Sequence, residues 1–287
     1  MPGFRVIGHA TRYRGEYNAV ADPALKNLSI NRPAAFFGGA AIGTLGGLIG
    51  LGGAEFRLPL LIGPFGFAAL EAVILNKAMS LVVVAFALPF RAAAVPFDQI
   101  AAHWPIIVNL LAGSLAGAWL GAGWATRLKS ETLYRVIAIL LLMIAAVLMF
   151  GHDIAAGSTL VTGTAQIIAG VVAGLAIGVV ASLLGVAGGE LLIPTLILLF
   201  GADIKLAGSL SLAVSLPTMI VGFTRYSRDQ SFAVIRSNRV FLLVMAAGSI
   251  LGALIGGQLL GTVPSAVLLP GLALILVISA MKVWRHS

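Results

Sequence analysis

The chain has 287 residues, of which 60% are hydrophobic and only 10% are charged, and its mean hydropathy is +1.06. A soluble domain carries about 25% charged residues, so this composition excludes a water-soluble globular protein and indicates an integral membrane protein. The net charge of +8 comes from Lys and Arg in tails and short loops, a pattern typical of cytoplasmic loops rather than of a nucleic-acid-binding surface.

The first half begins with a polar, basic segment over residues 1–32 that lacks the pattern of a signal peptide. We expect a cytoplasmic tail there, either lying along the lipid headgroups or forming a disordered leader. Apolar sequence over residues 33–67 is broken near residues 50–53, which predicts two half-helices. Three membrane-spanning helices are then expected, over residues 70–90, over 105–125 and in a last segment ending near 150.

The second half follows a small, polar linker over residues 151–163 and occupies residues 164–287. It repeats the order of the first half. A broken apolar segment is expected over residues 166–200, followed by helices over residues 204–223, 240–260 and 265–283. The predicted fold class is therefore an all-α polytopic membrane protein with two homologous halves, each made of a glycine-broken first segment and three transmembrane helices.

The glycine-rich breaks are the strongest sign of duplication. Gly50, Gly53, Glu55 and Pro59 recur 135 positions later as four residues of the same types, Gly185, Gly188, Glu190 and Pro194. The spacing continues without a gap into later helices, where Ser80 falls on Ser215. Register kept through loops indicates an internal repeat.

The distribution of basic residues predicts how the halves are oriented. The basic segments are the N-terminal tail, residues 127–135, residues 225–239 and the C-terminal tail. All four can face the cytoplasm only if the halves are inverted and each broken segment enters and leaves the membrane on one side. We therefore expect inverted repeats with re-entrant first segments, and N- and C-termini in the cytoplasm.

The glycine clusters are candidate binding sites. Irregular backbone survives in a membrane only inside protein or beside a water-filled cavity, and glycine lets the backbone approach a ligand. A half-helix starting at such a break directs free N–H groups and a positive dipole end toward the membrane centre, which favours an anion. The alternative is that glycine only permits tight helix packing. The candidate glycines are Gly50, Gly52, Gly53, Gly185, Gly188 and Gly189.

Glu55 and Glu190 are candidate proton-binding residues. An ionisable group inside a membrane segment costs at least about 2.5–3.5 kcal/mol on insertion scales and is a functional candidate. An ionised Glu would repel an anion, whereas a protonated one would not, and burial favours the protonated form. The alternatives are that each Glu caps its own half-helix, or that Glu55 pairs with Arg57.

Small polar residues on the following helices are candidate anion ligands. Residues four apart share a helix face, which groups Asn76 with Ser80 and Ser211 with Ser215. Lys77 lies one step round the helix, and Leu212 takes its place in the second half. The alternative is that each Ser bonds a carbonyl of its own helix. Glycine ladders at Gly113, Gly117 and Gly121, and at Gly248, Gly252 and Gly256, predict close helix packing instead.

Several chemistries are excluded by the sequence. No P-loop motif occurs, so the chain is not itself an ATPase. The Gly50-Leu51-Gly52 stretch lacks the strand and acidic partner of a dinucleotide site. The four His are scattered without metal-ligand spacing. The chain has no Cys, which excludes disulfides, thiolate catalysis and iron–sulfur clusters. No cofactor, metal or enzymatic activity is expected.

The two Gly-x-x-Gly-[Ala/Gly]-Glu-x-x-x-Pro stretches, together with Ala78-Met79-Ser80 and Ala213-Val214-Ser215, resemble the sulfite exporter TauE/SafE family, also called the toluene sulfonate uptake permeases. The resemblance covers residues 34–284. It implies a bacterial inner-membrane secondary carrier for anions such as sulfite, sulfonates, sulfoacetate or thiosulfate. Glu at both motif positions and Arg57 depart from the family's usual pattern, which leaves the substrate open.

The predicted function is thus secondary transport of a small anion by alternating access, driven by protons or by the membrane potential. An anion-selective channel and a transporter of another small organic anion are the alternatives, and a membrane enzyme would need a longer loop than any present. The expected partners are the anionic solute and membrane lipid, with no nucleic acid, and a homodimer is left open.

Overall fold

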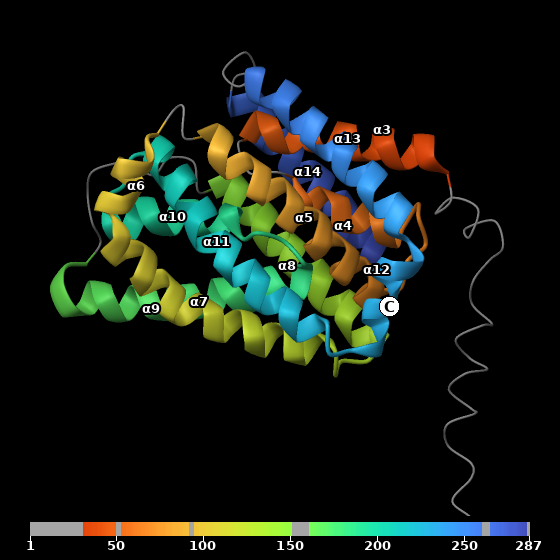
Figure 1. Ribbon diagram of the computed structural model, residues 1–287, viewed down its shortest axis with the longest axis horizontal. Coiled ribbons are helices and arrows are strands. Elements are labelled where there is room, and N and C mark those ends of the chain that lie inside the picture. Colours follow the sequence, from red (N-terminus) through yellow and green to blue (C-terminus); the bar gives the residue numbers. More distant parts are fainter. Residues whose placement is uncertain (1–30, 50–52, 92–94, 151–160, 260–264, 286–287) are drawn as a thin grey trace, which may run out of the picture.

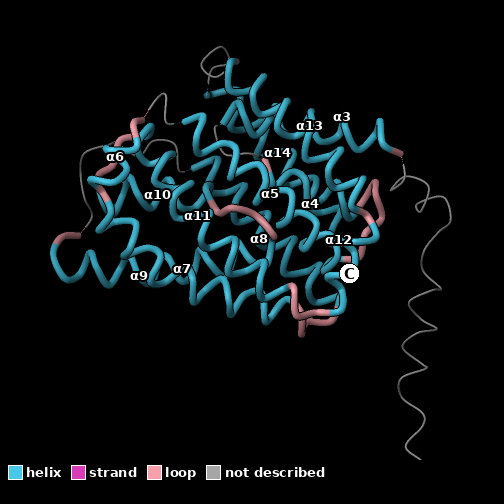
Figure 2. The backbone as a smooth tube through the Cα atoms, viewed as in Figure 1, coloured by secondary structure: helices cyan, strands magenta, loops and turns pink. Residues whose placement is uncertain are grey.

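The computed structural model describes residues 31–49, 53–91, 95–150, 161–259 and 265–285, and across these ranges every regular element is a helix (Figures 1 and 2). Six of the helices are long and apolar enough to cross a membrane. The helices of the first half are α3 (Arg32–Ile49), α4 (Ala54–Ile62), α5 (Ala69–Arg91), α6 (Phe97–Ala102), α7 (Trp104–Ala125) and α8 (Ser130–Phe150). Those of the second half are α9 (Gly163–Leu184), α10 (Gly189–Phe200), α11 (Ile204–Tyr226), α12 (Ala233–Ser237), α13 (Arg239–Gln258) and α14 (Ser265–Trp284), with a short 3₁₀ turn at Gln230–Phe232.

The predicted helices agree with these bounds to within a few residues, so an all-helical, multi-pass membrane protein is confirmed. The helix ends were predictable because apolar runs of spanning length stop where Gly, Pro and charged residues gather. The short helices α6 and α12 were not predicted, since both lie in segments that the sequence pattern assigned to loops. Residues 1–30, most of the expected tail, and residues 151–160 of the linker lie outside the described residues.

Each broken segment consists of two helices, and the second helix folds back along the first. A Cβ atom at Gly53 would lie 2.5 Å from the carbonyl oxygen of Ile42, and one at Gly38 would lie 3.0 Å from the Leu60 side chain. In the second half, a Cβ atom at Gly188 would lie 3.2 Å from Ala181. The Gln166 side chain also donates a hydrogen bond to the Leu199 carbonyl oxygen. Both segments are therefore helical hairpins that turn at a glycine cluster.

The backbone conformation explains why glycine occupies the two turns. Gly53 and Gly188 are the N-cap residues of α4 and α10, with φ of 68° and 83°. These are left-handed conformations, which cost a residue with a Cβ atom about 1–2 kcal/mol. Any side chain at Gly53 would in addition collide with the Ile42 carbonyl oxygen.

The first helix of each half packs against a later helix of the other half, α3 against α13 and α9 against α7. In the α7–α9 pair, a Cβ atom at Gly117 would overlap the Leu175 carbonyl oxygen. In the α3–α13 pair, a Cβ atom at Gly252 would overlap the Ala40 carbonyl oxygen. The two contacts use matching positions with the halves exchanged. Gly252 lies 135 positions after Gly117, and Ala40 lies 135 positions before Leu175. The glycine ladders thus provide close helix packing, as predicted.

The helices α5 and α11 form the centre of the bundle. Their apolar windows are 67% and 61% buried, whereas those of the other four candidate spans are 33–44% buried. The two helices contact each other, and α8 packs against α14. Polar residues on α5 and α11 are therefore held away from lipid, in the part of the fold where a binding site could lie.

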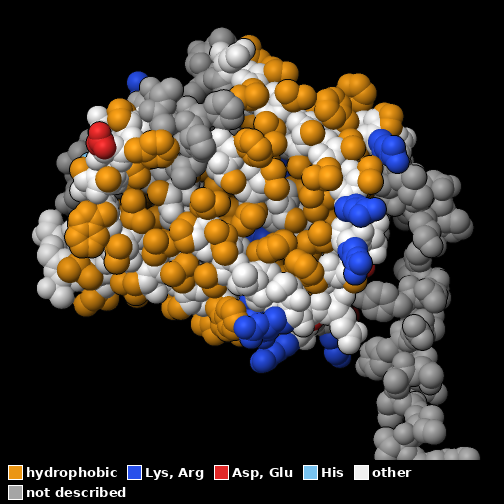
Figure 3. Space-filling view, in the orientation of Figure 1, with side chains coloured by type: hydrophobic (Ala, Val, Ile, Leu, Met, Phe, Trp, Pro, Cys, Tyr) orange, Lys and Arg blue, Asp and Glu red, His pale blue; other side chains and the backbone are white. Residues whose placement is uncertain are grey.

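The surface separates into an apolar belt and a basic end. Figure 3 shows orange side chains over most of the visible face and blue Lys and Arg side chains gathered along its right-hand and lower rim, near α12 and the start of α3. Large exposed side chains on the belt include Phe37, Trp104, Val172 and Leu243. An apolar belt of this extent is what lipid contact requires.

Candidate functional site

The two hairpin turns bring α4, α5, α9 and α10 together. Gly53 and Gly188 begin α4 and α10, Gly189 is the first residue of α10, and Gly185 is the left-handed C-cap of α9 with φ of 67°. The predicted residues Gly50 and Gly52 lie outside the described residues. The described glycines therefore occupy the helix ends at which the sequence predicted a site.

A fully buried guanidinium lies beside the first turn. Arg57 is 0% exposed, and its Nη1 atom donates to Asn76 Oδ1 at 3.4 Å and to Ser80 Oγ at 3.3 Å. Its Nε and Nη2 atoms have no hydrogen-bond partner among the described residues. The Nη1 atom is thus held by α5, while the Nε and Nη2 atoms on the adjacent edge are available to donate hydrogen bonds to a ligand.

Asn76 connects this arginine to both halves of the molecule. Its Nδ2 atom donates to the Ala54 carbonyl oxygen at 2.9 Å and to the Leu184 carbonyl oxygen at 3.1 Å. The first carbonyl belongs to α4, and the second belongs to the end of α9. Because both donor hydrogens are engaged, the amide oxygen is directed toward Arg57.

The two predicted proton-binding residues come close together although they are 135 positions apart in sequence. Glu55 and Glu190 lie in the first turns of α4 and α10, are 0% and 4% exposed, and interact electrostatically with each other. The Glu55 and Glu190 side chains also lie within hydrogen-bonding reach of each other, a contact that two carboxyl groups can make only when one of them carries a proton. Glu55 interacts electrostatically with Arg57, although no hydrogen bond or ion pair joins the two side chains among the described residues.

Lys77 has a different environment from that of Arg57. Its Nζ atom donates to the carbonyl oxygens of Ala181 at 3.0 Å and Val186 at 3.2 Å. These carbonyls lie at the C-terminal end of α9, where a positive charge complements the helix dipole. Lys77 therefore stabilises the break between α9 and α10, and its ammonium group is already engaged.

The three candidate serines differ in their hydrogen bonds. Ser80 faces Arg57. Ser215 Oγ donates to the Ala187 carbonyl oxygen at 2.8 Å, within the second glycine break. Ser211 Oγ donates to the Gly208 carbonyl oxygen at 2.8 Å, which is the bond within its own helix that was the alternative from sequence. Ser80 and Ser215 thus lie at the two breaks, and Ser211 is engaged locally.

Sequence reasoning missed the role of Arg57, which it treated only as a partner of Glu55. The available signal was its position, because an arginine within an apolar segment is itself a functional candidate. Leu192 stands at the matching position of the second half and is 1% exposed. Position 192 is thus packed without a cation, which makes Arg57 a candidate functional residue.

The comparisons with known proteins agree with this architecture. The family model for the sulfite exporter TauE/SafE matches residues 35–283 of the chain. The searches of curated proteins and of solved structures gave no match. The family match includes both glycine breaks and all the helices that surround them. The chain therefore belongs to the sulfite exporter TauE/SafE family.

Proposed function

We propose that this membrane transporter is a secondary carrier of small sulfur-containing oxyanions, such as sulfite, sulfonates, sulfoacetate or thiosulfate, in the bacterial inner membrane. The family is one of membrane transporters rather than enzymes, and the six apolar helices are of spanning length. The observation that carries the proposal on substrate is the buried edge of the Arg57 guanidinium.

The available edge of Arg57 suits an oxyanion. Its Nε and Nη2 atoms present parallel N–H groups, a fork that matches two oxygens of a single anion. The Nη1 hydrogen bonds to Asn76 and Ser80 fix the plane of the fork. A carboxylate presents the same two-oxygen geometry, so another small organic anion is the second candidate substrate.

The carboxyl pair provides a rationale for proton coupling. An anion beside Arg57 would be repelled by two ionised carboxylates at Glu55 and Glu190. Two like charges that are close together and buried favour a shared proton. In the proposed mechanism, a proton at this pair accompanies the anion.

The course of the chain supports inverted repeats with re-entrant hairpins. The turn after α4 reaches the basic end of the molecule, because Gly63 lies near the side chain of Lys282 in the C-terminal helix. Residue 32 also lies at that end, beside residues 236–241. The first hairpin then starts and finishes on the basic side, which is the cytoplasmic side under the positive-inside rule, together with both termini.

Burial of the site favours a carrier over a channel. Glu55, Arg57, Asn76 and Lys77 are each 0% exposed. A carrier passes through an occluded conformation of this kind, and access from either side requires a conformational change. An open pore would instead expose these groups along a continuous path.

The test is uptake of radiolabelled sulfite, thiosulfate and sulfoacetate into proteoliposomes, with acetate as a competitor. We expect saturable uptake that is accelerated by an imposed proton gradient. Single-channel currents that do not saturate would instead establish a channel. Uptake of acetate in preference to every sulfur anion would overturn the proposed substrate class.

A further inference from the structure

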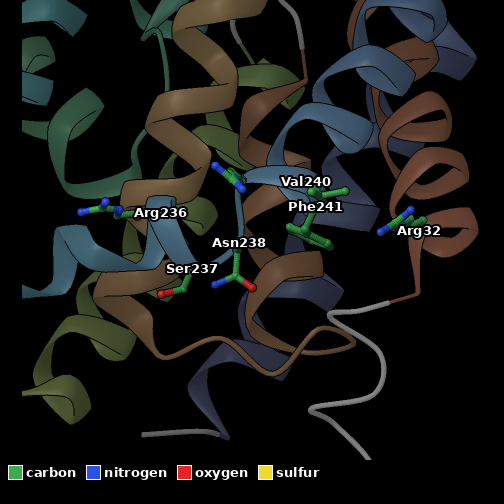
Figure 4. Close-up of a pocket in the computed structure, with 7 residues that line it drawn as sticks. Arg32, Arg236, Ser237, Asn238, Val240 and Phe241 are labelled. Atoms are coloured by element: carbon green, nitrogen blue, oxygen red, sulfur yellow. The ribbon is translucent and has the colours of Figure 1, made fainter.

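A pocket lined by arginines lies at the basic end of the molecule. This open pocket of about 540 Å³ is formed where α3 and α13 begin and α12 ends. The lining residues that matter here are Arg32, Arg236, Asn238, Arg239, Val240 and Phe241. Figure 4 shows Arg32 on one side, Arg236 on the opposite side, and Asn238 and Phe241 between them.

Within the part of the chain that the structure describes, no ion pair neutralises the positive charge of the pocket. Three of its lining residues are arginines and none is acidic. Among the described residues the arginines have no ion-pair partner, since the ion pair that is present joins Arg135 to Glu131. Arg32 and Arg239 are the first residues of α3 and α13, so the positive ends of two helix dipoles add to the charge.

The pocket adjoins surface that faces lipid. Val240 is 43% exposed, Leu243, one turn after Arg239, is 63% exposed, and Phe37 on α3 is 69% exposed. A ligand with a negatively charged head and an apolar tail would contact both the arginines and these side chains. The separation of Arg32 from Arg236 across the pocket (Figure 4) also suits an extended headgroup better than one small oxyanion.

The duplicated fold does not require these charges. In the first half, the positions that match Arg236 and Arg239 are Ala101 and Trp104, and in the second half the position that matches Arg32 is Ile167. The α3–α13 pair and the α7–α9 pair pack in the same way, yet only the α3–α13 pair begins with the arginines Arg32 and Arg239. Helix packing therefore does not explain these arginines, and a ligand outside the chain does.

We propose that this arginine pocket binds the headgroup of an anionic phospholipid in the leaflet at the basic end of the protein, with the acyl chains along α3 and α13. Basic pockets at the cytoplasmic ends of transmembrane helices have the chemistry that recognises such headgroups. The proposal is independent of what the transporter carries.

The experiment uses the purified full chain in detergent after delipidation. Dioleoylphosphatidylglycerol, dioleoylphosphatidylcholine and inorganic phosphate are titrated separately, and the thermal midpoint is measured. The pocket variant is Arg236→Gln with Arg239→Gln. The matched control is Arg127→Gln with Lys129→Gln, which removes the same charge from an exposed loop outside the pocket.

We expect phosphatidylglycerol to raise the midpoint of the unmodified protein and of the control, and to bind the pocket variant roughly tenfold more weakly. Equal effects of the two lipids, equal loss in the control, or equal stabilisation by inorganic phosphate would each overturn the proposal. Native mass spectrometry of the unmodified protein from an equimolar lipid mixture is a second measurement that needs no variant. Retention of phosphatidylglycerol over phosphatidylcholine is expected there, and equal retention would contradict it.

Discussion

Arg57 is the side chain on which the proposed anion site depends. Replacement by Met removes the charge and the fork while keeping an unbranched apolar side chain. Hydrogen bonds to a charged group contribute about 1.5–3 kcal/mol each, so we expect transport of sulfite to fall at least roughly tenfold. Arg57→Met also removes the donor of two long hydrogen bonds, of 3.4 Å and 3.3 Å, but it removes the cost of a buried charge as well, so the thermal midpoint should change little.

Arg57→Lys separates the contribution of charge from that of geometry, and Leu192→Met serves as its control. Arg57→Lys keeps a positive charge but loses the two-pronged contact, so the KM for the anion should increase while the protein still folds. Leu192→Met, at the matched position of the second half, should leave KM unchanged. Transport by Arg57→Met at the unmodified rate would remove Arg57 from the site.

Glu55 and Glu190 make a separate prediction about pH. Glutamine keeps the shape of the glutamate side chain but does not take up a proton near neutral pH. We expect Glu190→Gln proteoliposomes to take up the anion at a rate that no longer changes with external pH between about 5.5 and 8, because glutamine cannot carry the coupling proton. A pH profile identical to that of the unmodified protein would end the proton role of Glu190.

At the scale of single elements, Lys77 holds the end of α9. Lys77→Met leaves the Val186 carbonyl oxygen without its lysine donor, whereas the Ala181 carbonyl oxygen still accepts from the Val186 N–H. An unsatisfied buried acceptor costs about 1–3 kcal/mol, so the thermal midpoint should fall. Leu212→Met, at the matched position, should change it little. A stable Lys77→Met protein with impaired transport would instead assign Lys77 to the anion site.

The glycine contacts between helices make a stronger stability prediction. Gly117→Leu and Gly252→Leu each place a side chain where a carbonyl oxygen of the neighbouring helix lies, so α7 must separate from α9, or α3 from α13. We expect both variants to be recovered in low yield as monodisperse protein by size-exclusion chromatography. Gly271→Ala is the control, since a Cβ atom there meets nothing within 4 Å.

At the scale of the whole molecule, the proposed inverted arrangement predicts which loops share a side of the membrane. The chain contains no Cys, so single cysteines can be introduced without background. Ser130→Cys, at the first residue of α8, and Ser227→Cys, directly after α11, border basic loops at different positions in the order of the two halves, and Asp98→Cys lies in α6. A membrane-impermeant thiol reagent applied to intact cells should label only the cysteine at position 98. Labelling at position 130 but not at 227 would show that the halves are parallel.

The sequence predicted the elements well because each depends on a local property. Apolar length defines the spans, and the glycine clusters mark the two turns. The motif residues Glu55 and Glu190 were placed correctly near the breaks, and their mutual approach follows from both hairpins meeting at their turns. The internal repeat stays a prediction, which rests on matching residues at one constant spacing.

The polar contacts of the site could not be predicted in the same way. Lys77 reaches carbonyls that are 104 and 109 positions away, and Asn76 reaches one that is 108 positions away. These contacts depend on how α5 docks on the end of α9, which no local pattern specifies. Arg57 turns toward α5 rather than toward Glu55 for the same reason.

The close contacts between glycines and backbone carbonyl oxygens, in the α3–α13 and α7–α9 pairs, limit how the helices can move. Where backbone touches backbone, two helices can neither slide nor roll without collision, so α3 moves with α13 and α7 moves with α9. Each of these rigid units takes one helix from each half of the sequence, and the halves are therefore interlocked. They cannot rock apart as whole halves. Any movement that admits solute to the interior has to separate one rigid unit from the other, with α5 and α11 as the surfaces between them.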